Sequence, residues 1–306
     1  MKRRDFIQKT AASATLLTLG GLSLSSFASN SSVKKITILH TNDVHSHIDP
    51  FPATDPRNPN MGGVARRAAI IEQIRREEEF NVLLLDAGDI FQGTPYFNYY
   101  GGELEYKLMS MMKYDLVTIG NHDFDNGIDG LLAQMPHAEF EFVSANYDFK
   151  NTVLDTFVKP YKIFKKNGIK IGVFGLGIEL QGLVDAKLYK ETKYNNPIEV
   201  AQDISRILKE EQKCDLVICL SHLGYEYKND PEKPSDITLA RKTKYIDLII
   251  GGHTHTFLDK PVVEKNIEDK EVLINQVGCY GINLGRIDFY LDNKNNIIAG
   301  GKKIVI

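Results

Sequence analysis

Histidine, aspartate and asparagine side chains directly follow several apolar segments of this sequence. Five such places occur, within residues 39–45, 85–89, 119–123, 220–222 and 250–255. In open α/β sheets, ligands bind in the crevice outside the carboxyl ends of the strands. We therefore expect these five segments to deliver their polar side chains to one rim. Carboxylate, amide and imidazole groups together form a donor set that divalent transition metals favour, so the pattern predicts a metal site.

The spacing of the polar residues supports this prediction. Asp43 and His45 are two residues apart, so in an extended segment they would point the same way and could hold one ion. The same spacing recurs at His253 and His255. A single histidine or aspartate at a strand end also occurs as a cap or as a satisfied core group. Five in register favour a metal site, because buried polar clusters are usually paired or coordinate metals.

The elements that must position these residues can be predicted from the hydrophobic pattern. Short apolar runs predict strands over residues 36–40, 82–85, 116–119, 142–145, 170–175, 216–220, 248–250, 272–277, 283–291 and 297–306. Amphipathic periodicity predicts helices over residues 64–79, 103–112, 197–213 and 236–242. The mixture indicates one α/β or α+β domain with buried sheets, extending over residues 29–306.

Composition excludes several other classes of protein. The 306 residues are 42% hydrophobic and 25% charged, which is typical of a globular protein and not of a disordered or fibrous one. The formal charge of −3 supplies no basic field for a nucleic-acid polymer. Three cysteines are too few and too scattered for a disulfide scaffold or a structural zinc site.

The first 28 residues have the pattern of an export signal. A charged start with Arg3 and Arg4 precedes a short apolar stretch and a small-residue site for cleavage after Ala28. The arginine pair resembles a twin-arginine signal. We therefore expect a periplasmic or exported protein that meets a membrane only during export. An amphipathic helix or an uncleaved anchor is the alternative.

The polar blocks together resemble a known family. The segments Asp43-x-His45, Gly88-Asp89, Gly120-Asn121-His122-Asp123, His222 and Gly252-His253-Thr254-His255 are similar to those of the calcineurin-like metallophosphoesterases. Within that family, residues 41–45, 62–66, 91–95 and 121–125 resemble the bacterial 5′-nucleotidase branch. The resemblance implies a four-layer αββα fold, in which two packed mixed β-sheets are flanked by helices.

The resemblance also implies two divalent metal ions, with Zn, Mn, Fe and Co all compatible with the donor set. Carried over by position, the first ion would be held by Asp43, His45 and His255, and the second by Asn121, His222 and His253. Asp86 would bridge the two. Such a pair of ions clamps a phosphate and activates a hydroxide that attacks phosphorus.

Two further residues have catalytic roles by the same resemblance. His122 would steady the transition state or protonate the leaving oxygen, and Asp125 would orient its imidazole. The alternative for His122 is a seventh metal ligand or a support for one.

The implied function is an exported phosphoesterase that hydrolyses nucleotides or similar phosphate monoesters. A 2′,3′-cyclic nucleotide phosphodiesterase or a sugar-nucleotide pyrophosphatase is the alternative with the same centre, and a non-catalytic metal-binding subunit is the alternative of another class. The 5′-nucleotidases it resembles carry a second, C-terminal domain that reads the nucleobase. Because this sequence ends at Ile306, we expect a separate polypeptide of that kind as a partner; the alternative is an enzyme that accepts phosphoesters with little selection for the base.

Overall fold

The computed structural model describes residues 16–18, 33–292 and 296–306. The predicted export signal over residues 1–28 lies outside the described residues, apart from strand β1 (Leu16–Thr18), which pairs with a strand of the large sheet. In the described part of the chain, no helix has the length and apolar character needed to cross a membrane.

The larger of two main sheets carries the first group of predicted strands. Its order is β1-β16-β15-β2-β3-β4-β5-β7. Strands β2, β3, β4, β5 and β7 run parallel to one another, β15 is antiparallel to both β2 and β16, and β1 is antiparallel to β16. The bounds are β2 (Lys34–Thr41), β3 (Val82–Asp86), β4 (Leu116–Thr118), β5 (Glu141–Val143), β7 (Val158–Lys159), β15 (Asn283–Leu291) and β16 (Ile297–Val305). Strand β2 thus lies between β3, its neighbour in the chain, and β15 from near the C-terminus.

The second main sheet has the order β13-β14-β12-β11-β9-β8. Its four inner strands are parallel and its two edge strands antiparallel. The bounds are β8 (Tyr161–Lys166), β9 (Ile169–Gly177), β11 (Leu216–His222), β12 (Leu248–Gly251), β13 (Val262–Lys265) and β14 (Glu271–Asn275). A separate pair, β6 (Tyr147–Asp148) and β10 (Lys193–Tyr194), completes the strands of the described residues.

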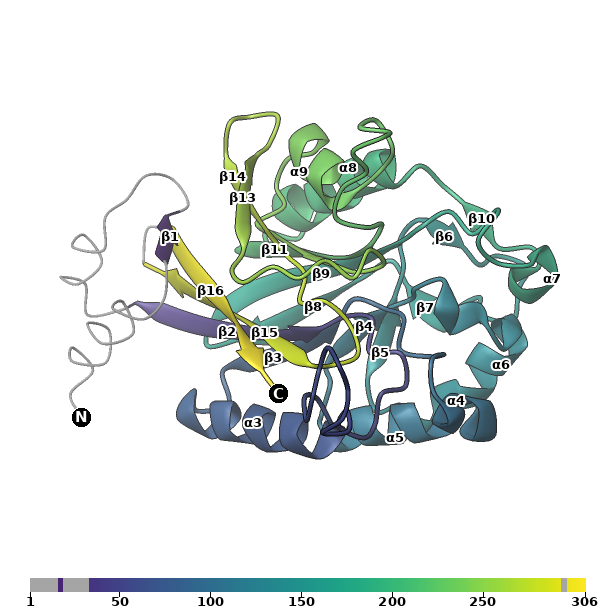
Figure 1. The fold of residues 1–306 in the computed structure, drawn as a ribbon. Coiled ribbons are helices and arrows are strands. Elements are labelled where there is room, and N and C mark those ends of the chain that lie inside the picture. The colour runs from purple at the N-terminus through teal and green to yellow at the C-terminus, as the bar shows by residue number, and fades with distance from the viewer. Residues whose placement is uncertain (1–15, 19–32, 293–295) are drawn as a thin grey trace.

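Helices cover the outer face of each main sheet, as Figure 1 shows. The larger sheet packs against α3 (Val64–Glu77), α4 (Pro95–Tyr100), α5 (Glu103–Met111) and α6 (Gly127–Gln134). The second sheet packs against α8 (Pro197–Arg206) and α9 (Asp236–Lys242). Short helical turns lie at His122–Phe124, Met135–His137, α7 (Ala186–Tyr189) and Ile207–Glu211. These layers confirm the predicted four-layer αββα architecture.

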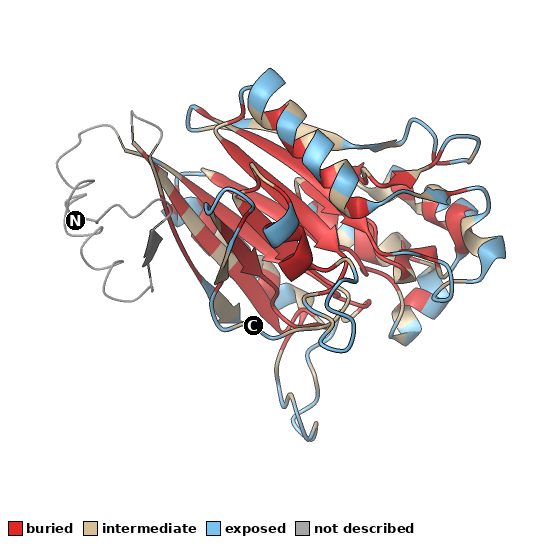
Figure 2. Ribbon diagram, turned by 90° about the horizontal axis from the view of Figure 1, so that it is seen from above, coloured by how far each residue is buried: buried red, intermediate tan, exposed pale blue. Residues whose placement is uncertain are grey.

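The sheets are apolar on both faces because each face packs on another layer. In β3, Leu83 and Leu85 face the core between the two sheets, whereas Val82 and Leu84 face the core beneath the helices. This alternation follows from the period of two along a strand. Figure 2 shows the resulting band of buried strands through the centre of the molecule. The parallel strands β2, β3, β4, β9, β11 and β12 end toward one rim, where the polar segments follow them.

Candidate metal centre

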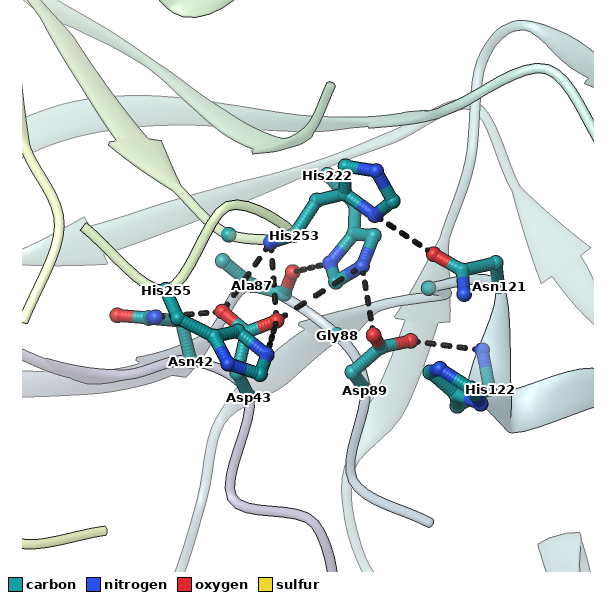
Figure 3. A network of polar contacts seen from close by, with 12 residues as sticks. Asn42, Asp43, Ala87, Gly88, Asp89, Asn121, His122, His222, His253 and His255 are labelled. Carbon is teal, nitrogen blue, oxygen red and sulfur yellow. Dashed lines mark hydrogen bonds and ion pairs between the residues drawn. The ribbon is translucent and has the colours of Figure 1, made fainter. Parts of the chain in front are cut away.

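Two groups of side chains that could each hold a metal ion lie at this rim. The first group is Asp43, His45 and His255, and the second is Asp89, His222 and His253. Within each group, the ligand atoms all lie within 4.8 Å of one another. Each group draws residues from both main sheets, since residues 43–45 and 89 follow β2 and β3, whereas residues 222, 253 and 255 end or follow β11 and β12. Figure 3 shows most of these side chains converging from opposite sides.

In the first group, two imidazoles face one another. His45 Nε2 lies 3.0 Å from His255 Nε2, and His255 Nε2 lies 3.4 Å from Asp43 Oδ1. His45 Nδ1 donates a hydrogen bond to the Phe91 carbonyl at 3.2 Å, which directs its Nε2 toward the group. At most one of the facing nitrogens can donate to the other. A cation bound by both lone pairs and the carboxylate satisfies all three groups.

In the second group, His222 is held in one orientation. Its Nδ1 donates to the Ala87 carbonyl at 2.7 Å, so its Nε2 faces the group. This buried Nε2 lies 3.1 Å from Asp89 Oδ2, yet it has no hydrogen-bond partner of suitable geometry among the described residues. Asn121 joins the group through its Oδ1, which lies 2.8 Å from His253 Nδ1. An orphaned imidazole nitrogen beside carboxylate and amide oxygens fits a metal ion.

Asp89 lies between the two groups. Its Oδ2 is 3.1 Å from His222 Nε2 in the second group and 3.9 Å from His45 Nε2 in the first. It therefore occupies the position that a carboxylate shared by two ions would take. The sequence analysis gave this position to Asp86, and the structure does not bring Asp86 into either group.

Asp86 points away from the rim for a geometric reason. It is the last residue of β3, and the period of two puts its side chain on the same face as Leu84, toward the helices. There its Oδ2 accepts from the Thr41 hydroxyl at 2.5 Å and its Oδ1 accepts from the Gly88 amide at 2.9 Å. Burial raises the pKa of Asp86 to about 8 despite these hydrogen bonds. Asp86 is therefore not placed to share two ions, whereas Asp89, three residues further into the turn, lies where a shared carboxylate would be.

The ligand-bearing segments are not extended, contrary to the premise of the spacing argument. Asp43, His45, Asp89, His253 and His255 all have positive φ angles, between 47° and 71°. Such backbone is sparsely populated by non-glycine residues and often occurs at functional sites, where the surroundings hold it. Here the Asp43 amide donates to the Gly88 carbonyl at 2.9 Å and the His45 amide to the Asp89 carbonyl at 3.1 Å. Each turn thus fixes the other.

The sequence analysis missed the role of Asp123. Its carboxylate accepts from the amides of Asp89, Ile90 and Gly120 at 3.1, 2.9 and 2.8 Å, and from Phe91 at 3.2 Å. The Asp123 side chain is buried. Through these hydrogen bonds it connects the turn that contains Asp89 with the turn that follows β4. A carboxylate next to His122 in the sequence was the available signal, because aspartate readily accepts from nearby backbone amides.

Comparison with known proteins agrees with this arrangement. The family described as calcineurin-like phosphoesterase matches residues 36–257, which include every residue of both groups. This chain belongs to that family.

Within the family, the chain is close to 5′-nucleotidases. It is 36% identical over 291 residues to the trifunctional nucleotide phosphoesterase protein YfkN of Bacillus subtilis, covering 85% of this chain and 18% of the relative. It is 32% identical over 292 residues to the human 5′-nucleotidase, covering 87% and 48%. Among solved structures, the 5′-nucleotidase precursor of Thermus thermophilus superposes with a TM-score of 0.80 at 31% identity, covering 89% and 54%. The chain thus spans about half the length of the 5′-nucleotidases it matches.

In this calcineurin-like phosphoesterase, burial and neighbouring charges shift the pKa values of several side chains at the rim. Burial disfavours the charged forms of Asp89 and His222, but their mutual attraction prevails, so the pKa of Asp89 is lowered and that of His222 is raised to about 10. The pKa of His255 is raised to about 10, first by its hydrogen bond to Asp43 and then by one to Cys279. Burial lowers the pKa of His253 to about 4. Metal ions would replace the protons on His222 and His255.

His122 and Asp125 lie beside the groups without belonging to them. His122 Nδ1 lies 3.1 Å from Asp125 Oδ2, and its ring centroid is 5.4 Å from that of His45. The His122 amide donates to Asp89 Oδ1 at 2.8 Å, which ties this residue to the centre. The hydrogen bond to Asp125 raises the pKa of His122. Its half-buried imidazole therefore favours the protonated form more than a free imidazole does and can act as a hydrogen-bond donor.

Proposed function

We propose that this chain is a dinuclear-metal phosphoesterase that hydrolyses nucleotides or similar phosphate monoesters. The observation that carries the proposal is the position of Asp89 between two complete ligand groups. The first group would hold one divalent ion, and the second group with Asn121 would hold the other. Similarity to nucleotide phosphoesterases and 5′-nucleotidases supports a phosphoester as the substrate.

Divalent ions, when bound, supply Lewis-acid polarisation of a phosphoryl oxygen and acidify water. The residues of the chain do the remaining work. The left-handed turns preorganise the ligands, and Asp123 keeps Asp89 in place through four backbone amides. His122, held by Asp125, presents an N–H that can donate to a phosphoester oxygen as charge develops on it or on the leaving group. His122 therefore acts on the substrate, and Asp125 positions His122.

A second class of substrate is supported by another relative. The chain superposes on the NAD nucleotidase of Haemophilus influenzae with a TM-score of 0.77 at 27% identity. This similarity favours including the pyrophosphate link of a dinucleotide such as NAD among the substrates to be tested. Two-metal sites in general can stabilise both the attacking and the leaving oxygen of such a displacement.

We also propose that a separate polypeptide or domain supplies recognition of the nucleobase. The match to only about half of each 5′-nucleotidase supports this proposal. Export through the signal predicted over residues 1–28 is a further proposal, and the description of the Thermus relative as a precursor is in line with it.

The test is phosphate release from AMP by residues 29–306, after loading with Zn, Mn, Fe or Co and after treatment with a chelator. Rapid release that the chelator abolishes supports a nucleotidase. No phosphate release from AMP, together with p-nitrophenol release from bis(p-nitrophenyl) phosphate or ring opening of a 2′,3′-cyclic nucleotide to a nucleoside monophosphate, points to the diesterase alternative. If the folded protein binds no divalent metal, the proposal of a metal-dependent phosphoesterase is wrong.

A further inference from the structure

A small cavity lies directly beneath the turn that carries Asp43 and His45. It is lined by Val44 and Ser46 of that turn, by Arg67 of α3 and by Glu105 of α5, together with apolar side chains of both helices. The cavity has room for about one water molecule. It is separate from the two ligand groups, and none of its lining residues belongs to them.

Three buried polar atoms at this cavity are unpaired. Arg67 Nε, Arg67 Nη1 and Glu105 Oε2 have no hydrogen-bond partner in the part of the chain that the structure describes. Both side chains are 3% exposed, and no ion pair between them is found within the described residues. Arg67 and Glu105 both line this cavity, and their unpaired buried atoms need a partner, because an unsatisfied buried polar group is destabilising.

The chemistry of the cavity selects water as the occupant. A cation would be repelled by the Arg67 guanidinium, and an anion would be repelled by the Glu105 carboxylate. A water molecule can accept from Arg67 Nε–H or Nη1–H and donate to Glu105 Oε2. Buried waters typically make two to four such bonds to otherwise unsatisfied groups.

Glu105 reaches the metal centre through Ser46. The other carboxylate oxygen, Oε1, accepts from the Ser46 hydroxyl. Ser46 is held again by Thr94, whose hydroxyl donates to the Ser46 carbonyl at 2.9 Å, and by its own amide, which donates to the Ile90 carbonyl at 2.9 Å. Ser46 has a φ of 56° and follows His45, which has a φ of 47°. The strained backbone of His45 is thus fixed from below by Glu105.

We propose that this cavity holds an ordered water that joins Arg67 to Glu105, and that Glu105 is a positioning residue for His45. The water fixes the carboxylate, the carboxylate fixes Ser46, and Ser46 fixes the left-handed turn. The positioning role rests on the proposed metal centre, whereas the water site does not.

A crystal structure at a resolution that shows ordered waters tests the first part. We expect a water within hydrogen-bond distance of Glu105 Oε2 and of Arg67 Nε or Nη1. An empty cavity, or a direct Arg67–Glu105 ion pair, would overturn the water site whatever the protein catalyses.

Cobalt binding followed by visible absorption tests the second part without measuring activity. Glu105→Gln is expected to weaken Co²⁺ binding by roughly 10-fold or more and to change the d–d bands, as loss of a partner behind a ligand does. Ser46→Ala, which removes a single hydroxyl, is expected to act in the same direction. Glu103→Gln, on the same helix but exposed and paired with Lys107, is the matched control and should match the wild type.

The outcomes separate the two proposals. If the wild type binds Co²⁺ and both Glu105→Gln and Ser46→Ala keep its affinity and spectrum, the positioning role is overturned and the metal centre stands. If the folded wild type binds no Co²⁺, the proposed function fails, and the positioning role with it, while the crystallographic water still decides the cavity.

Discussion

Asp89 Oδ2 and His222 Nε2 lie 3.1 Å apart, and this contact joins the turn after β3 in one main sheet to the end of β11 in the other. Asp86, only three residues earlier, instead accepts hydrogen bonds from the Thr41 hydroxyl and the Gly88 amide beneath the rim. The two aspartates therefore have separable roles, which a pair of isosteric variants can distinguish.

Asp89→Asn is expected to lower both metal content and the rate of phosphoester hydrolysis by at least roughly 100-fold, since even the partners of metal ligands are worth about 10- to 100-fold. Asp86→Asn should keep its metal and cost about 1 kcal/mol of stability, because an amide can still accept from Gly88 and donate to Thr41. Metal analysis, steady-state kinetics and denaturant unfolding measure these effects. Metal loss in Asp86→Asn alone would restore the original assignment.

His122→Asn is expected to lower kcat by roughly 100-fold or more, the usual contribution of a positioned proton donor. Asp125→Asn should cause a smaller loss of about 10-fold, because the neutral amide can still accept from the imidazole but no longer supplies the negative charge that helps to raise its pKa. Both variants should retain wild-type metal content. Asp129→Asn, which alters an exposed acid paired with Lys190, is the control. Metal loss in His122→Asn would show that this residue is a ligand instead.

Gly120→Ala is expected to disrupt the second group. An added Cβ would collide with Asp89 Oδ1 and lie 2.8 Å from His222 Cε1. We predict lower metal content with the overall fold retained, measured by metal analysis and circular dichroism. Gly182→Ala is a demanding control, because Gly182 has a φ of 84° but nothing within 4 Å of an added Cβ. Equal metal loss in both variants would mean that general destabilisation, and not contact with Asp89, is responsible.

Removal of metal is expected to lower the melting temperature. An ion that binds only the folded state stabilises it by about 2.7 kcal/mol when its free concentration is 100 times its Kd. Differential scanning calorimetry of chelated and Zn-, Mn- or Co-loaded protein measures the effect. The Asp89→Asn variant should show a much smaller shift, and an equal shift there would place the stabilising ions elsewhere.

His40 makes the fold sensitive to acid in a predictable direction. Burial lowers the pKa of His40 from 6.5 to about 3, so between these values the unfolded chain binds a proton that the folded chain does not. Stability therefore falls as the pH drops below about 6.5, by up to about 1.4 kcal/mol per pH unit, or about 2 kcal/mol at pH 5.

His40→Gln removes this titration while keeping an acceptor for the Asn275 side chain, which lies 2.8 Å from His40 Nε2. The difference in unfolding free energy between variant and wild type should therefore shift in favour of the variant as the pH falls from about 8 to about 5. His137→Gln, at a partly exposed histidine, is the control. A difference that stays constant with pH would contradict the assignment to His40.

Much of the fold could be predicted from the hydrophobic pattern. The strand over residues 283–291 and the helix over residues 236–242 have the predicted bounds, because caps and turns delimit both. The predicted helix over residues 197–213 ends as α8 at Arg206 and continues as a π-helical turn over Ile207–Glu211. Strands β7 and β13 were not predicted, since edge strands with exposed or half-buried residues lack a continuous apolar run.

The candidate site was less accessible to sequence reasoning. The histidines and Asp43 were found because each directly follows an apolar strand. Asp86 and Asp89 both satisfy that criterion. They differ because Asp86 is the last residue of β3, on the face of Leu84, whereas Asp89 lies in the left-handed turn beyond the strand. The left-handed turns could not be read from residue types, because aspartate and histidine usually adopt other backbone conformations. That Arg67 and Glu105 line one cavity depends on two helices that pack together only in the folded protein.

The order of strands in the larger sheet has a consequence for synthesis of the chain. Strand β2 forms one of its two ladders with β15, whose residues follow it by more than 240 positions. A ribosome that has completed β3 exposes a strand with an open edge, and the two metal groups still lack His222, His253 and His255. Contacts between such distant segments form slowly, because closing a long loop has an entropic cost that must be met before the contact contributes any stability. Metal uptake by this chain would therefore mark the end of its folding, and a nascent or truncated chain would remain metal-free.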